Sequence, residues 1–361
     1  HAPREYGRVV EGQRARGRYG CLRPMGQHDS AGLWFAWVTA AADWNRRGTA
    51  RKPRSVALLL AVLGLTLSTV EARAQAGCDC STRQGCEQCS FNQVVRVMVA
   101  KEQDIATQTH GCAKLALKGT ALPRAEDSLA RSVEAVTGAM KTFPADQGKY
   151  MQLAAIPSYS KLLALHQSCC ETLAKLAGIG SQHSQAQQAG GVELVTAAML
   201  AFPSEQPLQA KALAALGNIV QGNAPAQNAA YSGGSMHAAL AAMIAFPDSS
   251  VVQENGCHAL GGMAEGAERG EELADEIGAA GGIATIVGAM QKHTGRWMLQ
   301  QFCCSALFEL VAGGGTTHSG HAATAIAAGA VEVAEIAGKK HKHAQKCRKL
   351  AEKLVATKQE L

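Results

Sequence analysis

Four cysteines packed into twelve residues are the first candidates for chemistry in this 361-residue chain. They are Cys78, Cys80, Cys86 and Cys89, separated by one, five and two residues. In an oxidising compartment this density favours two disulfide bonds, and the sequence leaves three connectivities open. A zinc site made of all four cysteines is the alternative, but the short spacers are tight for tetrahedral ligation. We therefore predict that the four cysteines pair with each other and hold no metal.

Other cysteines recur at long intervals, at one position of an internal repeat. They are Cys112, Cys170, Cys257 and Cys304, and another copy of the repeat has Leu213 at the same position. A position that accepts leucine is typical of a small buried hydrophobe. We therefore predict that these four thiols are buried, unbridged and not catalytic.

Motifs for enzyme chemistry are missing from the sequence. It contains no phosphate-binding Gly-x4-Gly-Lys-Ser/Thr, no complete Gly-x-Gly-x-x-Gly after a strand, no His-Glu-x-x-His and no Gly-x-Ser-x-Gly. We expect no catalytic residues, no cofactor and no metal. The protein is therefore predicted not to be an enzyme.

The elements that position these residues follow from a repeat marked by methionine. A small or apolar residue stands fourteen residues after the methionine, and a leucine stands three residues further on. The copies are Met98 with Cys112 and Leu115, Met199 with Leu213 and Leu216, Met243 with Cys257 and Leu260, and Met290 with Cys304 and Leu307. Met140 with Cys170 and Leu173 fits after an insertion of 16 residues between Pro144 and Cys170. A degenerate last copy puts Gly338 in place of methionine and aligns Cys347 with the cysteine position.

The repeat length predicts two or three helices per copy. Apolar residues at helical spacing precede each methionine. Glycine pairs lie before that helix in three copies, at Gly190-Gly191, Gly233-Gly234 and Gly281-Gly282. Phe202-Pro203 and Phe246-Pro247 mark its end in their copies. The methionine therefore lies on a second helix, and the cysteine and leucine positions lie on a third.

The copies resemble armadillo repeats, particularly those of leucine-rich-repeat kinases and many protist proteins. AGGVELVTAAMLAFPSEQPLQAKALAALGNI and HAALAAMIAFPDSSVVQENGCHALGGMAEG carry the resemblance. It implies an all-α fold, a right-handed α-solenoid of about six armadillo-like repeats over residues 91–357. We expect a disordered N-terminal extension before it. The family's peptide-binding members carry tryptophan and asparagine on the third helix, and of these only Asn218 is matched here.

The resemblance also implies a function, namely a protein-protein interaction scaffold or adaptor whose concave surface binds an extended peptide or a partner helix. The concave-face candidates from the third helices are Glu171, Lys175, Asn218, His258 and Glu309. Two alternatives remain open. One is a nucleotide-exchange factor or regulator of the lumenal heat-shock chaperone, and the other is an armadillo fragment of a larger regulatory kinase.

Residues 55–76 have the pattern of a signal peptide or signal anchor. Basic residues precede an apolar run over 56–70, and small-x-small cleavage candidates follow it. The run would anchor the protein in a membrane if the signal stayed uncleaved. Residues 1–54 are interpreted as an unstructured, artefactual extension, and residues 77–90 as the cysteine-rich start of the mature chain. We expect a location in the secretory pathway, in the lumen of the endoplasmic reticulum, with membrane-anchored and cytoplasmic locations as alternatives.

Residues 358–361 read Lys-Gln-Glu-Leu, a variant of the Lys-Asp-Glu-Leu retention signal. Retrieval receptors need the terminal leucine carboxylate free. Appending two residues after Leu361 is therefore expected to release the protein to the culture medium, as followed with a tag on the mature N-terminus. Unchanged retention of the extended chain would show that the tetrapeptide is a coincidence.

Charge is distributed unevenly along the chain. Residues 1–54 and 339–361 carry net charges of +7 and +6, whereas residues 55–338 carry −7, so the net charge of +6 comes from the ends. The repeat region therefore offers no basic stripe for phosphates, and no nucleic-acid partner is expected. The expected partner is a protein or peptide.

Overall fold

Helices make up the regular structure of this chain. The computed structural model describes residues 78–117, 126–145, 156–266, 270–311, 316–342 and 344–360. These residues form seventeen helices and no strand, so the prediction of an all-α protein is confirmed for them. The predicted extension at 1–54 and the predicted signal at 55–76 lie outside the described residues.

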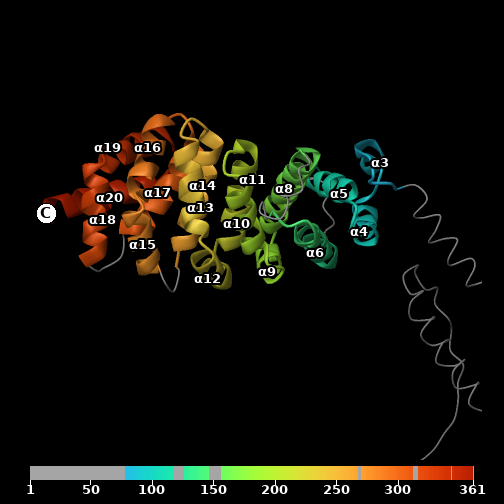
Figure 1. The fold of residues 1–361 in the computed structure, drawn as a ribbon. Helices are drawn as coiled ribbons and strands as arrows, with labels where there is room; N and C mark the ends of the chain where they lie inside the picture. Colours follow the sequence, from blue (N-terminus) through green and yellow to red (C-terminus); the bar gives the residue numbers. More distant parts are fainter. Residues whose placement is uncertain are drawn as a thin grey trace, which may run out of the picture. The chain divides into compact units, whose positions relative to one another are not determined.

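The helices lie in chain order within the unit Thr69–Leu361 (Figure 1). The first eight are α3 (Arg83–Glu87), α4 (Phe91–Ala100), α5 (Ile105–Leu117), α6 (Glu126–Thr142), α8 (Ile156–Ala177), α9 (Gln182–Gln188), α10 (Gly191–Ala201) and α11 (Gln206–Val220). The others are α12 (Ala224–Ser232), α13 (Ser235–Ala245), α14 (Ser250–Ala264), α15 (Gly270–Ala279), α16 (Gly282–Lys292), α17 (Trp297–Val311), α18 (Thr316–Ala327), α19 (Ala330–Lys340) and α20 (Gln345–Glu360).

The marker methionines occupy equivalent places. Met199, Met243 and Met290 are each the ninth residue of an 11-residue helix, and each is at most 1% exposed. Each of these helices begins after a glycine with φ between 74° and 80°. Only glycine adopts that backbone conformation at little cost, which explains why every such turn carries one. The fixed offset in the sequence therefore reflects one structural unit used repeatedly.

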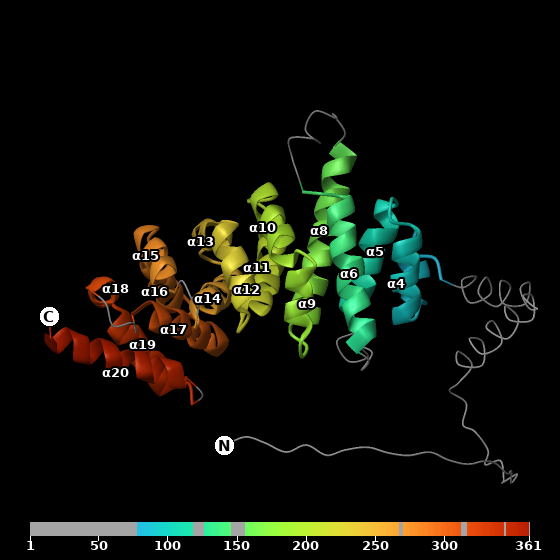
Figure 2. The ribbon, with the colours of Figure 1, turned by 90° about the horizontal axis from the view of Figure 1, so that it is seen from below.

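One helix from each copy forms the main line of packing. These helices, here called the third-helix series, are α5, α8, α11, α14, α17 and α20, and each packs against the next. The second helices α4, α6, α10, α13, α16 and α19 pack in the same order beside them (Figure 2). Leucine, valine, alanine, methionine and cysteine side chains fill the space between the two rows.

In four copies a buried glutamine ties the end of the second helix to the start of the third. The Nε2 atom of Gln253 donates to the carbonyl oxygens of Met243 and Phe246, at 2.7 and 3.0 Å. The three other glutamines that donate in this way, each to a carbonyl pair one turn apart, are Gln108, Gln209 and Gln300. All four follow the marker methionine by ten residues. They satisfy carbonyls that the end of a helix leaves without intrahelical partners.

In two other copies a basic side chain binds carbonyl oxygens at the end of the second helix. In the copy with the insertion, Nε2 of His166 lies 2.9 Å from the carbonyl oxygen of Phe143 and must carry the proton that it donates. In the last copy, the guanidinium of Arg348 donates to the carbonyls of Gly338 and Lys342. The capping glutamines stand at a fixed distance from the methionine, so the sequence carried a signal for them that was not used in the predictions.

The stability of the fold should depend on pH through His166. Burial lowers the pKa of His166 to about 4, from 6.5 for the free side chain. The folded chain therefore keeps His166 neutral while the unfolded chain takes up a proton, so stability is full above pH 6.5 and is lost as the pH falls toward 4.

Between pH 7 and pH 4.5 the free energy of unfolding of the His166→Gln variant should fall by about 2–3 kcal/mol less than that of the unmodified chain. The reason is that glutamine caps the same turn without titrating. Urea unfolding of both proteins at the two pH values measures the difference. An equal loss in the variant and the unmodified chain would contradict this assignment.

The third-helix cysteines are buried as predicted, but the prediction that they are unbridged is wrong for three of the four. Cys112, Cys170, Cys257 and Cys304 are all 0% exposed. Disulfide bonds join Cys112 to Cys169, Cys257 to Cys303, and Cys304 to Cys347, with Cα separations of 5.0, 4.8 and 4.9 Å. Stacking of the third helices brings each of these cysteines against the residue that precedes the equivalent position on the next helix.

Two details of the repeat alignment are changed by these bonds. Cys347 bonds to the preceding helix as Cys303 does, so Cys347 is in register with Cys303 and not with Cys304, as the sequence alignment had it. Cys170 is the one free cysteine among the described residues, because α11 has Ala212 at the position where a bonding cysteine would stand.

The predicted insertion of the Met140 copy lies partly in α8. That helix has 22 residues, whereas α11, α14 and α17 have 15 each. Another part of the insertion lies at 146–155, outside the described residues. The insertion therefore lengthens the third helix at its start and leaves the packing of its later turns on α5 and α11 in place.

Candidate functional site

The five predicted binding residues all lie on the third-helix series. Glu171 and Lys175 are on α8, Asn218 is on α11, His258 is on α14 and Glu309 is on α17. Lys175 is exposed and the other four are partly exposed. Each of them contacts a neighbouring third helix or its end.

Lys175 and Asn218 make equivalent contacts in successive copies. The ammonium of Lys175 donates to the carbonyl oxygen of Ala116 on α5, at 2.5 Å. The Nδ2 atom of Asn218 donates to the carbonyl oxygen of Ala174 on α8, at 2.7 Å. Both side chains reach back by one helix and satisfy a carbonyl near its C-terminal end. Asn218 therefore has a structural partner on the preceding helix, in addition to any partner on the surface.

Glu171 is the centre of a charged cluster between α8 and α11. Its two carboxylate oxygens lie 2.9 Å from the ammonium of Lys175 and 3.0 Å from that of Lys211. Burial raises the pKa of Glu171, but the hydrogen bonds and charges of the two lysines outweigh it, so the pKa lies below its usual value. Glu171 therefore stays ionised at neutral pH. Lys211 was missed from sequence because it lies one copy further along the chain.

His258 links three third helices. Its ring stacks on the ring of Phe302 from α17, with 4.5 Å between centroids and 25° between planes. Its Nε2 atom lies 3.3 Å from Oε1 of Gln221, at the end of α11. Burial lowers the pKa of His258. At neutral pH the ring is therefore uncharged and offers an aromatic, hydrogen-bonding surface.

Glu309 on α17 is the last of the five predicted residues along the chain. Its carboxylate lies 3.2 Å from the ammonium of Lys346 on α20, and that ammonium is 5.2 Å from the ring centroid of Phe308. The side chains of Glu309 and Lys346 are 20% and 32% exposed. Because the pair is partly shielded from water, it is stronger than an exposed surface pair. Lys346 and Phe308 belong with Glu309 at this end of the surface.

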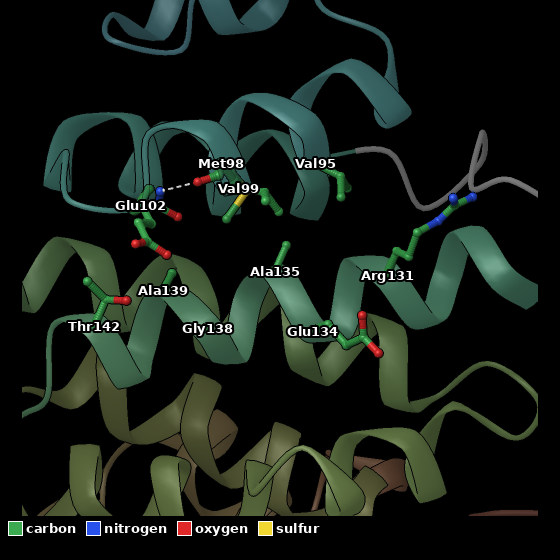
Figure 3. Close-up of a pocket in the computed structure, with 11 residues that line it drawn as sticks. Val95, Met98, Val99, Glu102, Arg131, Glu134, Ala135, Gly138, Ala139 and Thr142 are labelled. Atoms are coloured by element: carbon green, nitrogen blue, oxygen red, sulfur yellow. Dashed lines mark hydrogen bonds between the residues drawn. The ribbon is translucent and has the colours of Figure 1, made fainter.

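A hollow of about 270 Å³ lies elsewhere, between α4 and α6 (Figure 3). Val95, Val99, Ala135 and Ala139 give it an apolar lining, and charged side chains including Glu102, Arg131 and Glu134 contribute to its walls. None of the five predicted residues contributes to it. The predicted surface and this hollow are therefore separate features.

Cys170 does not provide a nucleophile. Burial raises the pKa of this thiol to about 12, so it remains protonated at neutral pH. It is the one free thiol among the described residues. Thiolate chemistry at neutral pH therefore has no candidate in this part of the chain.

The chain matches no protein-family model and no curated protein sequence. Within the described part of the chain, no single helix is long and apolar enough to cross a membrane. Glu271–Ala279 and Gly282–Lys292 satisfy the length and composition of a span as a pair, with a bend of 72° between them.

Proposed function

We propose that this chain is a right-handed α-solenoid of about six armadillo-like repeats that acts as a protein-interaction scaffold or adaptor. The ordered packing of the third-helix series supports the solenoid, because each member contacts the next from α5 to α20. The equal lengths of α10, α13 and α16, and of α11, α14 and α17, support a repeated unit. Such stacks bury a continuous core and leave one long surface available for binding.

The line of partly exposed polar side chains on the third-helix series carries the proposal. Glu171, Asn218, His258 and Glu309 place a carboxylate, an amide, a neutral imidazole and a second carboxylate on successive helices. Each is held by a neighbouring helix, so little side-chain entropy remains to be lost when a partner binds. An extended peptide or a partner helix that crosses the third helices would meet these groups in turn.

The disulfide bonds support a secretory compartment for this adaptor. Ten of the described cysteines form five disulfide bonds, and three of these bonds connect successive third helices. Disulfide bonds persist in oxidising compartments and are rare in the cytosol. The partner would then be a protein or peptide of the same compartment.

The test compares two variants of the tagged protein. The third-helix variant combines Glu171→Ala, His258→Ala and Glu309→Ala, and the control variant combines the exposed second-helix changes Glu193→Ala and His237→Ala. Proteins recovered with each from microsomes are quantified by mass spectrometry, and circular dichroism checks that both variants remain helical. We expect a specific partner to be reduced at least about tenfold by the third-helix variant alone. Equal recovery with both variants would refute the proposed surface.

A further inference from the structure

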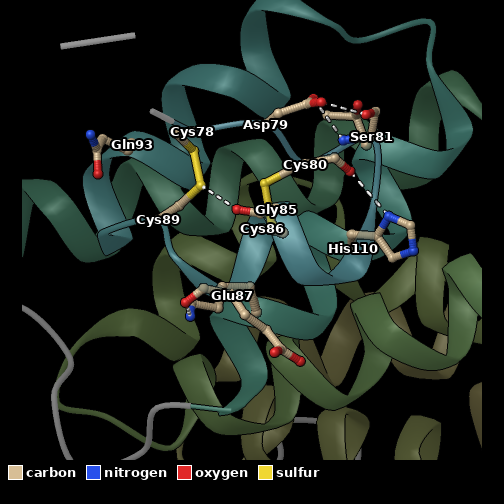
Figure 4. The surroundings of a disulfide bond; sticks show 12 residues. Cys78, Asp79, Cys80, Ser81, Gly85, Cys86, Glu87, Cys89, Gln93 and His110 are labelled. Atoms are coloured by element: carbon tan, nitrogen blue, oxygen red, sulfur yellow. Dashed lines mark hydrogen bonds between the residues drawn. A yellow bond between two sulfur atoms is a disulfide. The ribbon is translucent and has the colours of Figure 1, made fainter. Parts of the chain in front are cut away.

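The four N-terminal cysteines lie close enough together to ligate one metal ion. Disulfide bonds join Cys78 to Cys89 and Cys80 to Cys86, and the two bonds lie beside each other (Figure 4). The sulfur atoms of Cys78, Cys80 and Cys89 are all within 4.8 Å of one another, and Cys86 is bonded to the second of them. None of the four residues is more than 9% exposed. A shielded cluster of four sulfur atoms is therefore already assembled.

The helix α5 supports this cluster with two polar side chains one turn apart. Nδ1 of His110 lies 3.1 Å from the carbonyl oxygen of Cys80 (Figure 4). The ammonium of Lys114 donates to the carbonyl oxygen of Glu87, next to Cys86 in sequence. Lys114 is only 8% exposed, and no ion pair of its ammonium is found among the described residues. Two disulfide bonds are neutral, so they provide no counter-charge for this buried cation.

We propose that reduction of the two disulfide bonds converts this cluster into a tetrahedral zinc site formed by Cys78, Cys80, Cys86 and Cys89. Each disulfide accepts two electrons and two protons from one molecule of a dithiol, which is itself oxidised to a disulfide. The four thiols then lose four protons as their sulfur atoms bind one Zn²⁺ ion. The product carries a net charge of −2, and the ammonium of Lys114 supplies the nearby positive charge.

The geometry suits zinc. Zinc–sulfur bonds of about 2.3 Å place the sulfur atoms of a tetrahedral site about 3.8 Å apart, so the sulfur atoms need to separate only modestly from their bonded positions. Cys86 and Cys89 have the two-residue spacing common in structural zinc sites. The backbone N–H of Cys89 donates to the carbonyl of Cys86 at 3.1 Å, in a turn that holds the two ligands on one side. This inference concerns a site away from the proposed partner surface and does not depend on it.

The test uses the full chain, reduced with a phosphine and titrated with Zn²⁺ or Co²⁺. Bound zinc is measured by elemental analysis, and tetrahedral thiolate ligation by the visible absorption of the cobalt form. We expect one metal ion per reduced chain and none per oxidised chain. Cys78→Ser with Cys89→Ser should abolish binding, whereas Cys257→Ser with Cys303→Ser should leave it intact. Circular dichroism confirms that each reduced protein remains helical.

Lys114→Met provides a second readout that leaves all four ligands in place. We expect it to weaken zinc binding at least about tenfold, whereas Lys353→Met, an exposed change on α20, should leave the affinity unchanged. Absence of metal binding by the reduced, helical chain would overturn the proposal. Stoichiometric binding by the Cys78→Ser, Cys89→Ser variant would also overturn it, because the ligands would then lie elsewhere.

Discussion

Replacing Cys257 and Cys303 together by alanine is expected to lower the free energy of unfolding by about 4 kcal/mol. The disulfide between them closes a loop with a sequence separation of 46, and its loss returns that loop's freedom to the unfolded chain. Both sulfur atoms are buried, so their removal also leaves a small void. Chemical denaturation of the oxidised proteins measures the loss. A change below about 1 kcal/mol would contradict a bond between these cysteines.

A second change is expected to add a disulfide bond between α8 and α11, which have none between them. Cys170 on α8 is free, and Ala212 on α11 is buried at the position where other copies carry the bonding partner, Cys169 or Cys303. Ala212→Cys should therefore form a disulfide with Cys170, detectable by mass spectrometry of peptides from the unreduced protein. Ala215→Cys, also buried on α11 but out of register, is the matched control and should leave Cys170 free.

Gln253→Glu is expected to destabilise the fold by about 3 kcal/mol or more at pH 7. The amide of Gln253 donates to two carbonyl oxygens, whereas an ionised carboxylate would face them without a proton to donate. The side chain is 2% exposed, so water cannot compensate. The folded state should raise the pKa of the introduced carboxyl group, so the variant should regain stability relative to the unmodified chain as the pH falls.

Gln291→Glu is the control for this substitution. Gln291 also donates to a carbonyl oxygen, that of Ala328, but its side chain is exposed to solvent. The same chemical change should therefore cost less than about 0.5 kcal/mol, as is usual at exposed positions. Urea unfolding at pH 7 compares the two variants. Equal losses would show that the double hydrogen bond of Gln253 contributes little.

Local signals in the sequence were sufficient to predict the second and third helices of the copies. The glycine before α10, α13, α16 and α19, the phenylalanine and proline after α10 and α13, and the methionine offset each act within a few turns of the chain. These signals therefore predicted the helical structure and the burial of Met199, Met243 and Met290. The third-helix location of Glu171 and Asn218 followed as well, because it needs only the register within one copy.

Contacts between copies could not be predicted from the sequence. Cys304 bonds to Cys347 because α17 packs on α20 in a particular register, and the alignment had placed Cys347 one position away. Lys211 pairs with Glu171, and Phe302 stacks on His258, across the same kind of boundary. Periodicity within a repeat identifies equivalent residues, but it does not specify which residue of the next copy each one meets.

Photocrosslinking from position 258 is the most direct test of the proposed binding surface. A photoreactive amino acid is placed at position 258 on α14 or, as a control, at position 237 on the neighbouring second helix α13. After irradiation in cells, adducts of the tagged protein are separated by size and identified by mass spectrometry. The proposal predicts a discrete adduct with a secretory-pathway protein from position 258 and none from position 237. Equal labelling from both positions, or labelling from position 237 alone, would contradict partner binding on the third-helix series.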